Sequence, residues 1–314
     1  MKLIKKLLLL FVVLFFGISA WAQTNSSYVF KDIPFKIIPN KDTVKLDLFL
    51  PTVRRYVTTP LVLHIHGGAW VEGDKDIEQY YYMRSLRDSL QQNGIAYMSI
   101  NYRLLNSNIH LKDQLEDVYA SLEWLKDNAS KYNIDLNNVG VIGESAGAHL
   151  ALMLTYSDVA KPAVPINYIV DLFGPTDINA LLRTNAGWVV KTAFKWVKPK
   201  LYDLRNRLLL QMTNNDIEKN KNKVKEVAAS FSPINYINGK VKTPILMQHG
   251  TKDPIVPYKQ SIALKRKLDK FGIENYLIKV PKADHGFTTT SKVELNTLIK
   301  GALDFILSNS QMNQ

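Results

Sequence analysis

Hydrophobic and polar positions follow two different periods along the chain, which predicts both strands and helices. Residues 28–38 and 44–50 alternate apolar with polar, as antiparallel strands with one solvated face do. A short run at 61–66, apolar apart from His64 and His66, is typical of a buried strand. These segments predict an antiparallel sheet edge followed by a strand inside the core.

Beyond this point, helical and strand-like stretches alternate. We expect helices at 77–93, 111–128, from Ser145 onward, 256–271 and 295–307, and strands at 95–100, 139–143, 166–172, 244–248 and 276–280. Such alternation predicts an α/β fold, a mostly parallel central sheet with helices on both faces. In open sheets of this kind, chemistry takes place at the carboxyl ends of the strands.

One segment, at about 178–231, breaks the alternation. It consists of amphipathic, lysine-rich stretches without a strand pattern. We expect a helical insertion that covers the pocket as a cap or lid. Four aromatic residues in it are candidates to shape an acyl or aryl site, although a place in the core of the lid is favoured for most of them: Trp188, Phe194, Trp196 and Tyr202.

The N-terminus carries the pattern of a secretory signal. Three lysines within residues 1–6 precede an almost unbroken apolar run at 7–18, and Ala20-Trp21-Ala22 supplies small residues two apart. The run is shorter than the ~20 apolar residues that span a membrane. We therefore expect a signal peptide at 1–22, export to the periplasm or out of the cell, and no stable membrane anchor after cleavage.

The composition favours one compact domain over 23–314. The chain of 314 residues is 46% hydrophobic, and no repeat or linker divides it. It contains no cysteine, which excludes disulfides, a lipid-modified N-terminal cysteine and a thiol nucleophile. The formal net charge is +12, but the lysines are scattered and lack the interleaved aromatic residues of a nucleic-acid module. We expect a solvated basic surface and no nucleic-acid partner.

A candidate nucleophile lies in Gly143-Glu144-Ser145-Ala146-Gly147, a G-x-S-x-G pattern between a predicted strand and a predicted helix. A serine hydroxyl attacks efficiently only when a base takes its proton, a further group orients that base, and donors hold the oxyanion. We expect the sharp turn to strain the backbone at Ser145. A glycine-rich turn without chemistry is the alternative, which the strand-turn-helix context disfavours. Glu144 is expected to be structural.

The general base is expected to be His285, on a loop after the last predicted strand. This position fits the chain order of serine, acid and histidine in such sheets. For the other five histidines a structural role is favoured, with His66 holding its loop by hydrogen bonds: His64, His66, His110, His149 and His249.

The orienting acid is expected to be Asp253, on the loop after the predicted strand at 244–248. Asp177, after the preceding strand, is a rival because a carboxylate there can also reach the imidazole. Asp284 is the weakest candidate, since it is adjacent to His285 and projects away from it.

Donors for the oxyanion are expected in His66-Gly67-Gly68-Ala69-Trp70, which follows a predicted strand. Glycines let the backbone approach a substrate and turn its N–H groups inward. The expected donors are the amides of Gly68, Ala69 and Ala146, with Gly67 as a further candidate.

Together these motifs resemble the α/β-hydrolase superfamily. The likeness rests on the segments at 66–70 and 143–151 and on Asn101-Tyr102-Arg103-Leu104, Gly250-Thr251-Lys252-Asp253 and Asp284-His285-Gly286-Phe287, and it covers roughly 28–307. Within the superfamily, the chain is most similar to the bacterial carbohydrate-esterase and feruloyl-esterase-like (BD-FAE-like) group, near the hormone-sensitive-lipase type.

The resemblance implies the α/β-hydrolase fold and hydrolysis of carboxylic esters by Ser145, Asp253 and His285, without a cofactor or metal. The implied substrates are acetyl, feruloyl or other short acyl or aryl esters, free or linked to carbohydrate. One position departs from the pattern, because relatives commonly carry a third glycine or an aromatic residue where Ala69 stands. The departure concerns the shape of the pocket more than the activity.

Two other functions stay open at this point. An amidase or peptidase of the same fold would use the same three residues. A non-catalytic binding protein is disfavoured because the serine, acid and histidine positions are all filled. The sequence leaves the oligomeric state open.

Overall fold

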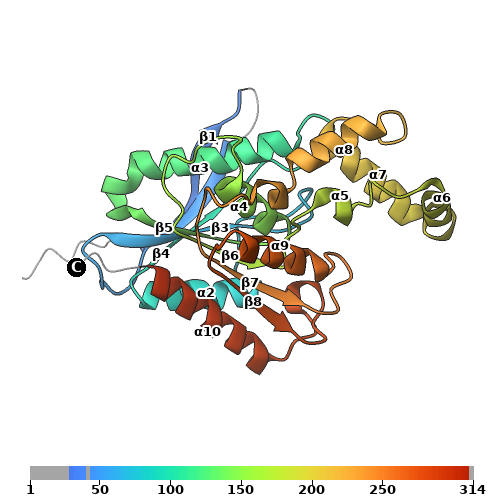
Figure 1. Ribbon diagram of the computed structural model, residues 1–314. Helices are drawn as coiled ribbons and strands as arrows, with labels where there is room; N and C mark the ends of the chain where they lie inside the picture. The colour runs from blue at the N-terminus through green and yellow to red at the C-terminus, as the bar shows by residue number, and fades with distance from the viewer. Residues whose placement is uncertain (1–27, 40–42, 311–314) are drawn as a thin grey trace, which may run out of the picture.

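An eight-stranded sheet forms the centre of the protein (Figure 1). The structure is a computed structural model that describes residues 28–39 and 43–310. The expected signal peptide at 1–22 lies outside the described residues. The strands are β1 (Val29–Ile37), β2 (Thr43–Phe49), β3 (Thr59–Ile65), β4 (Ala96–Ile100), β5 (Ile134–Glu144), β6 (Tyr168–Leu172), β7 (Ile245–Gly250) and β8 (Asn275–Val280).

The strands lie in the order β1-β2-β4-β3-β5-β6-β7-β8. The pairs β1–β2 and β2–β4 are antiparallel, and every later pair in the sheet is parallel. The mostly parallel sheet with an antiparallel edge is therefore confirmed.

Helices cover both faces of the sheet (Figure 1). On one face lie α2 (Tyr81–Gln92) and α10 (Lys292–Asn309), and on the other lie α3 (Leu111–Tyr132), α4 (Ala146–Tyr156) and α9 (Lys259–Lys270). The core is correspondingly divided in two. In β3, Leu61 and Leu63 pack on the side of α3 and α4, whereas Val62 packs on the side of α2. Burial on both faces explains why this strand is mostly apolar.

Several boundaries differ from the sequence-based expectation, most of all the one between α3 and β5. Helix α3 continues to Tyr132, past the expected end at Asn128, and β5 begins at Ile134. Asn133 ends the helix in the left-handed conformation, with φ 55°. Asparagine tolerates this conformation better than most residues. Because Asn128 and Asn133 could each end the helix, the sequence alone did not identify the stop.

The segment between β6 and β7 is helical. It contains α5 (Ile178–Leu181), α6 (Trp188–Val197), α7 (Pro199–Thr213) and α8 (Lys221–Ser230). Helices α6 and α7, here called the arm (residues 188–213), project away from the sheet at the right of Figure 1. No helix in the described part of the chain is long and apolar enough to cross a membrane.

The aromatic side chains of the arm do not all lie in its core. Tyr202 is buried, and its ring lies 5.8 Å from that of Phe194. Trp188 and Trp196 are 78% and 81% exposed. The expectation of a place in the lid core is therefore wrong for these two tryptophans, because α6 turns them away from the rest of the molecule.

Candidate active site

Ser145 alone makes the turn from β5 to α4. Its backbone adopts φ 51° and ψ −115°, and its N–H donates to the Leu172 carbonyl at 2.9 Å. A non-glycine residue at positive φ costs energy and persists only where its surroundings hold it. The strain expected at this position is confirmed.

The turn is held by the close approach of α4 to β3. A Cβ atom at Gly147 would lie 1.9 Å from the Ile65 carbonyl oxygen. Only glycine fits this contact, which sets the first turn of α4 against the end of β3. The serine is thereby raised at the carboxyl end of the sheet, with its amide neighbours at the N-terminus of a helix.

The structure brings Ser145, His285 and Asp253 into one chain of contacts. His285 Nε2 lies 3.0 Å from Ser145 Oγ, and His285 Nδ1 lies 2.7 Å from Asp253 Oδ2. Because a carboxylate accepts, Nδ1 carries the proton and donates it to Asp253. The unprotonated Nε2 then faces the serine hydroxyl, which is the arrangement required of a general base. The Phe173 ring packs edge-on against the imidazole, 4.7 Å between centroids.

Asp253 is fixed by three further contacts. Its Oδ1 accepts from the N–H groups of Ile255 at 2.8 Å and Val256 at 2.9 Å, while His249 Nε2 lies 3.2 Å from Oδ2. Burial alone would raise the pKa of Asp253, but the hydrogen bonds from His249 and His285 hold that pKa well below the usual range. The carboxylate therefore stays ionised while it orients the imidazole. The loop-orienting role expected for His249 includes this contact with Asp253.

The two rival acids have other roles. Asp177 accepts from the Ala180 N–H at 2.9 Å and is the N-cap of α5. Asp284 accepts from the Thr289 N–H at 3.1 Å and closes the turn that carries His285. The structure therefore supports the preference for Asp253.

The loop after β3 has an unusual backbone. Gly68, Ala69 and Trp70 have successive φ values of 106°, 50° and 65°. A Cβ at Gly68 would lie 2.0 Å from the Glu72 carbonyl oxygen, so this position requires glycine. Gly68 and Ala69 line the same cavity as Ser145, and Ala146 is the first residue of α4.

The expectation for Gly67 needs correction. Its N–H donates to Glu144 Oε1 at 3.2 Å and is therefore occupied by a protein acceptor. Glu144 Oε2 lies 2.9 Å from His64 Nε2. Burial raises the pKa of Glu144, yet the neighbouring His64 and the hydrogen bonds bring it below its ordinary value. Glu144 thus links the loop after β3 to His64 within β3, and Gly67 is not counted among the expected oxyanion donors.

Trp70 ties the same loop to α4. Its Nε1 donates to His149 Nδ1 at 3.2 Å, and His149 Nε2 donates to the Phe231 carbonyl at 2.7 Å. Indole only donates, so the proton of His149 must sit on Nε2. Burial lowers the pKa of His149 to about 4, which keeps the ring neutral.

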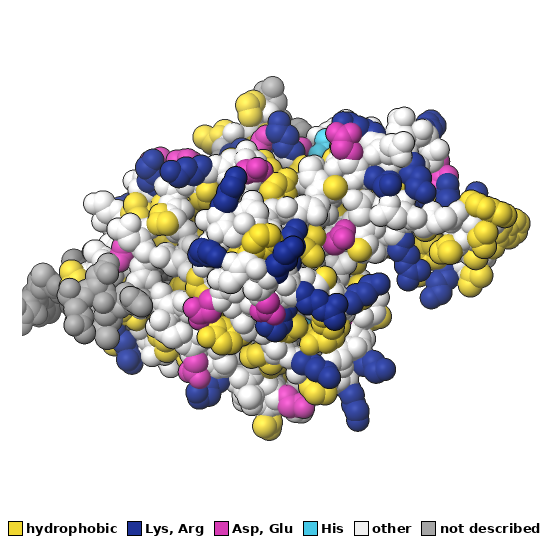
Figure 2. Space-filling view, viewed as in Figure 1, with side chains coloured by type: hydrophobic (Ala, Val, Ile, Leu, Met, Phe, Trp, Pro, Cys, Tyr) yellow, Lys and Arg dark blue, Asp and Glu magenta, His cyan; other side chains and the backbone are white. Residues whose placement is uncertain are grey.

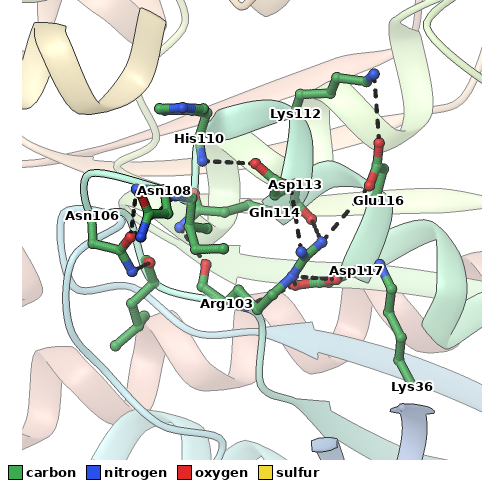
Figure 3. Close-up of polar contacts among 12 residues, drawn as sticks. Lys36, Arg103, Asn106, Asn108, His110, Lys112, Asp113, Gln114, Glu116 and Asp117 are labelled. Carbon is green, nitrogen blue, oxygen red and sulfur yellow. Dashed lines mark hydrogen bonds and ion pairs between the residues drawn. The ribbon is translucent and has the colours of Figure 1, made fainter. Parts of the chain in front are cut away.

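The loop after β4 is anchored on α3 (Figure 3). Arg103 Nε lies 2.8 Å from Asp117 Oδ2, and Lys36 Nζ lies 2.6 Å from Asp117 Oδ1. Gln114 Nε2 donates to the carbonyls of Trp70 and Arg103, both at 2.8 Å. One buried amide therefore holds two loops of the site together. The sequence offered no signal for this contact beyond the motif at 101–104.

A cavity of about 580 Å³ lies in front of Ser145. Its walls come from the loop after β3, the start of α2, and the loops that carry Phe173 and His285. The described residues that line it are His66, Gly67, Gly68, Ala69, Glu72, Gly73, Asp74, Tyr80, Tyr82, Met83, Glu144, Ser145, Leu172, Phe173, Ile255, His285, Gly286 and Phe287. None of these lies in the helical segment at 178–231, so the expectation that this insertion covers the pocket is wrong for this structure.

Comparison with known proteins places this geometry in context. The chain is 24% identical to the non-reducing polyketide synthase Preu6 of Preussia isomera over 91% of its length, but spans only 15% of that protein. It is 26% identical to esterase LipC of Mycobacterium tuberculosis (strain ATCC 25618 / H37Rv) over 73% of its length, and spans about half of that protein, 53%.

The fold is also found among solved structures. A truncated form of a carbohydrate esterase from gut microbiota has 22% sequence identity and a TM-score of 0.69, covering 92% of this chain and 98% of that one. The architecture is therefore the α/β-hydrolase fold, as the motifs implied. The BD-FAE family model matches residues 46–268, from β2 into α9. The chain therefore belongs to the BD-FAE family.

Proposed function

We propose that the protein is a serine hydrolase of carboxylic esters. The observation that carries the proposal is the line of contacts from Ser145 Oγ to His285 Nε2 at 3.0 Å and from His285 Nδ1 to Asp253 at 2.7 Å. These contacts end at an open cavity beside the N-terminus of α4. Membership of the BD-FAE family supports the same chemistry.

In the first half-reaction, His285 Nε2 takes the proton of Ser145 as Oγ bonds to the carbonyl carbon of the ester. The carbonyl π electrons move to oxygen, where the amides of Ala146 and of Gly68 or Ala69 hold the charge. Asp253 stabilises the imidazolium. When the carbonyl re-forms, the bond to the alcohol breaks and His285 Nε2 protonates the leaving oxygen.

In the second half-reaction, water takes the place of the alcohol. His285 removes a proton from water as its oxygen attacks the acyl-enzyme, and the same amides hold the second oxyanion. Collapse breaks the bond to Ser145, whose oxygen recovers its proton from His285. The products are a carboxylic acid and the enzyme in its starting state.

The cavity favours a small, uncharged acyl or aryl group. Its volume of about 580 Å³ lies within the ordinary range of small-molecule sites. Tyr80, Tyr82, Met83 and Phe173 supply apolar walls. The described lining contains no lysine or arginine that would attract an anionic group, and its acids are Glu72, Asp74 and Glu144. We therefore propose acetyl, feruloyl or similar short esters as substrates. The similarity to the carbohydrate esterase from gut microbiota supports a carbohydrate-linked ester as one such substrate.

The test is hydrolysis of p-nitrophenyl acetate, butyrate and laurate and of methyl ferulate by the purified protein and by Ser145→Ala. We expect turnover of at least one short or aryl ester and a loss of at least about 10,000-fold in the variant. A fluorophosphonate probe provides the control, since it should label the native protein and not the variant. Labelling without ester turnover would leave the reactive serine but reject the substrate class, and absence of both would reject the proposal.

We also propose that the protein is exported. The support is the charged start, apolar run and Ala20-Trp21-Ala22 site in the sequence. Expression of the full chain in a bacterial host should yield a periplasmic or secreted form that begins at Gln23. Recovery of the uncleaved chain in the cytosol would contradict this.

A further inference from the structure

The arm carries a set of exposed apolar side chains at the tip of the molecule. Figure 2 shows hydrophobic side chains gathered at the right edge, where Figure 1 places α6, with lysine and arginine side chains beside them. The most exposed of these apolar residues are Trp188 at 78%, Trp196 at 81%, Val197 at 75% and Val189 at 60%. Contiguous apolar surface of this kind marks an interaction site more often than ordinary surface does.

The apolar residues share the outer side of α6. Val189, Ala193 and Trp196 follow the i, i+4, i+7 spacing of one helical face and are all exposed. The inner side is held differently, because Phe194 packs on Tyr202 and Lys191 pairs with Glu218. The helix is therefore anchored through one side and presents the other to the surroundings.

Helix α6 contains lysines and no acid, whereas the exposed Asp203 follows on α7 and Glu218 pairs with Lys191 on the inner side. Residues 178–202 contain no aspartate or glutamate. Lys195, Lys198 and Lys200 are exposed at the end of α6 and the start of α7. Tryptophan and valine on one face with lysines at its border is the pattern of helices that lie in the interface of an anionic bilayer.

We propose that the outer face of α6 is a docking surface for an anionic lipid bilayer. The tryptophans would enter the boundary between headgroups and acyl chains, where their rings find both an apolar and a polar environment. The lysines would face the lipid phosphates. Binding of this kind is peripheral and reversible, and it needs no membrane-spanning helix.

A second copy of the chain fits this face less well. A two-fold contact through α6 would bring the three exposed lysines of one arm toward those of the other, and α6 itself contains no acid to offset them. The protein's own pocket is also a poor partner, since no described residue of the arm lines it. An anionic bilayer offers acyl chains to the apolar residues and phosphates to the lysines.

The experiment is sedimentation of the purified protein with vesicles of phosphatidylglycerol and phosphatidylcholine in equal parts, and with phosphatidylcholine alone. We expect partitioning to the mixed vesicles that is about tenfold or more stronger and that falls with added salt. Trp188→Ser/Trp196→Ser should weaken it about tenfold. Because both side chains are exposed, the circular dichroism spectrum of this variant should be unchanged.

A matched control is Ile37→Ser/Val293→Ser, which removes two side chains of similar exposure, 79% and 77%, from other elements. It should bind vesicles as the native protein does. Equal weakening in both variants, or no sedimentation with the mixed vesicles, would overturn the proposal. So would a native dimer that the tryptophan variant converts to a monomer while vesicle binding stays unchanged, because the occupant would then be a second copy.

Discussion

The carboxyl end of the sheet and the arm use their side chains in opposite ways. Around Ser145, most buried polar groups are paired, and Trp70 is 3% exposed with its indole hydrogen-bonded to His149. On the arm, Trp188 is 78% exposed. The same residue type is therefore packed and hydrogen-bonded in one region and largely exposed in the other. Internal contacts explain the residues of the site, whereas the exposed apolar residues of α6 are the surface that we propose to dock on a bilayer.

The largest expected effect, on kcat, comes from replacing Asp253, which the sequence favoured over Asp177 as the acid that orients His285. Asp253→Asn should lower kcat by about 10,000-fold, because the amide no longer fixes the proton on His285 Nδ1. Asp177→Asn is the matched control. It keeps an N-cap for α5 and should change kcat less than twofold, since asparagine caps as well as aspartate. Steady-state kinetics on one p-nitrophenyl ester measures both, and similar losses in the two variants would reverse the assignment.

Replacing one glycine in each region with alanine tests how closely the backbone there is packed. Gly147→Ala places a Cβ 1.9 Å from the Ile65 carbonyl oxygen and should lower the free energy of unfolding by about 3 kcal/mol or more. At Gly187, which begins α6, a Cβ meets nothing within 4 Å. Gly187→Ala should therefore change stability by less than about 0.5 kcal/mol. Urea denaturation compares them, and a tolerated Gly147→Ala would contradict the close approach of α4 to β3.

The buried carboxylate of Asp171 should make the free energy of unfolding depend on pH. Asp171 in β6 is fully buried, its Oδ2 has no partner among the described residues, and burial raises its pKa to about 6 from the model-compound value of 3.8. As pH rises from about 4 to about 6, the unfolded chain ionises here before the folded protein does, so this residue costs stability.

The Asp171→Asn variant removes this dependence. Its stability relative to the native protein should therefore increase by on the order of 2–3 kcal/mol between about pH 4 and about pH 6, and stay constant above. Asp203→Asn, on the exposed side of α7, controls for the loss of one negative charge. Urea denaturation across this range provides the measurement. A pH-independent difference would show that Asp171 is ionised in both states.

The smallest effect comes from the same change at two tryptophans. Trp70→Phe removes the hydrogen bond to His149 and leaves the buried Nδ1 of His149 without a donor. This should lower the free energy of unfolding by about 1–2 kcal/mol. Trp188→Phe should change the free energy of unfolding by less than about 0.5 kcal/mol. Thermal or urea denaturation measures both. Equal losses would mean that Trp188 packs on the protein in solution.

Much of the fold follows from sequence because burial on both faces imposes a simple pattern. The run at 61–66 and the alternation after it predicted the sheet, and the turn at 143–147 predicted the strain at Ser145. Side-chain contacts between distant segments leave no such pattern in the sequence and could not be predicted from it. The hydrogen bond from Gly67 to Glu144 joins residues 77 positions apart and depends on a side-chain conformation.

The arm shows a different limit. Its amphipathic pattern predicted helices correctly, since periodicity indicates which side of a helix is apolar. Periodicity does not indicate what that side contacts. The expectation that Trp188 and Trp196 lie within a lid assumed a partner inside the chain, and in this structure the helix turns them outward.

The backbone at Ser145 also limits which amino acids evolution could use as the nucleophile. At φ 51°, a side chain branched at Cβ collides with its own backbone, so threonine is excluded although its hydroxyl has the same chemistry. Cysteine has the same unbranched shape as serine and could occupy the position without moving the turn. The backbone conformation at position 145 therefore restricts which amino acids can serve as the nucleophile, independently of how reactive their side chains are.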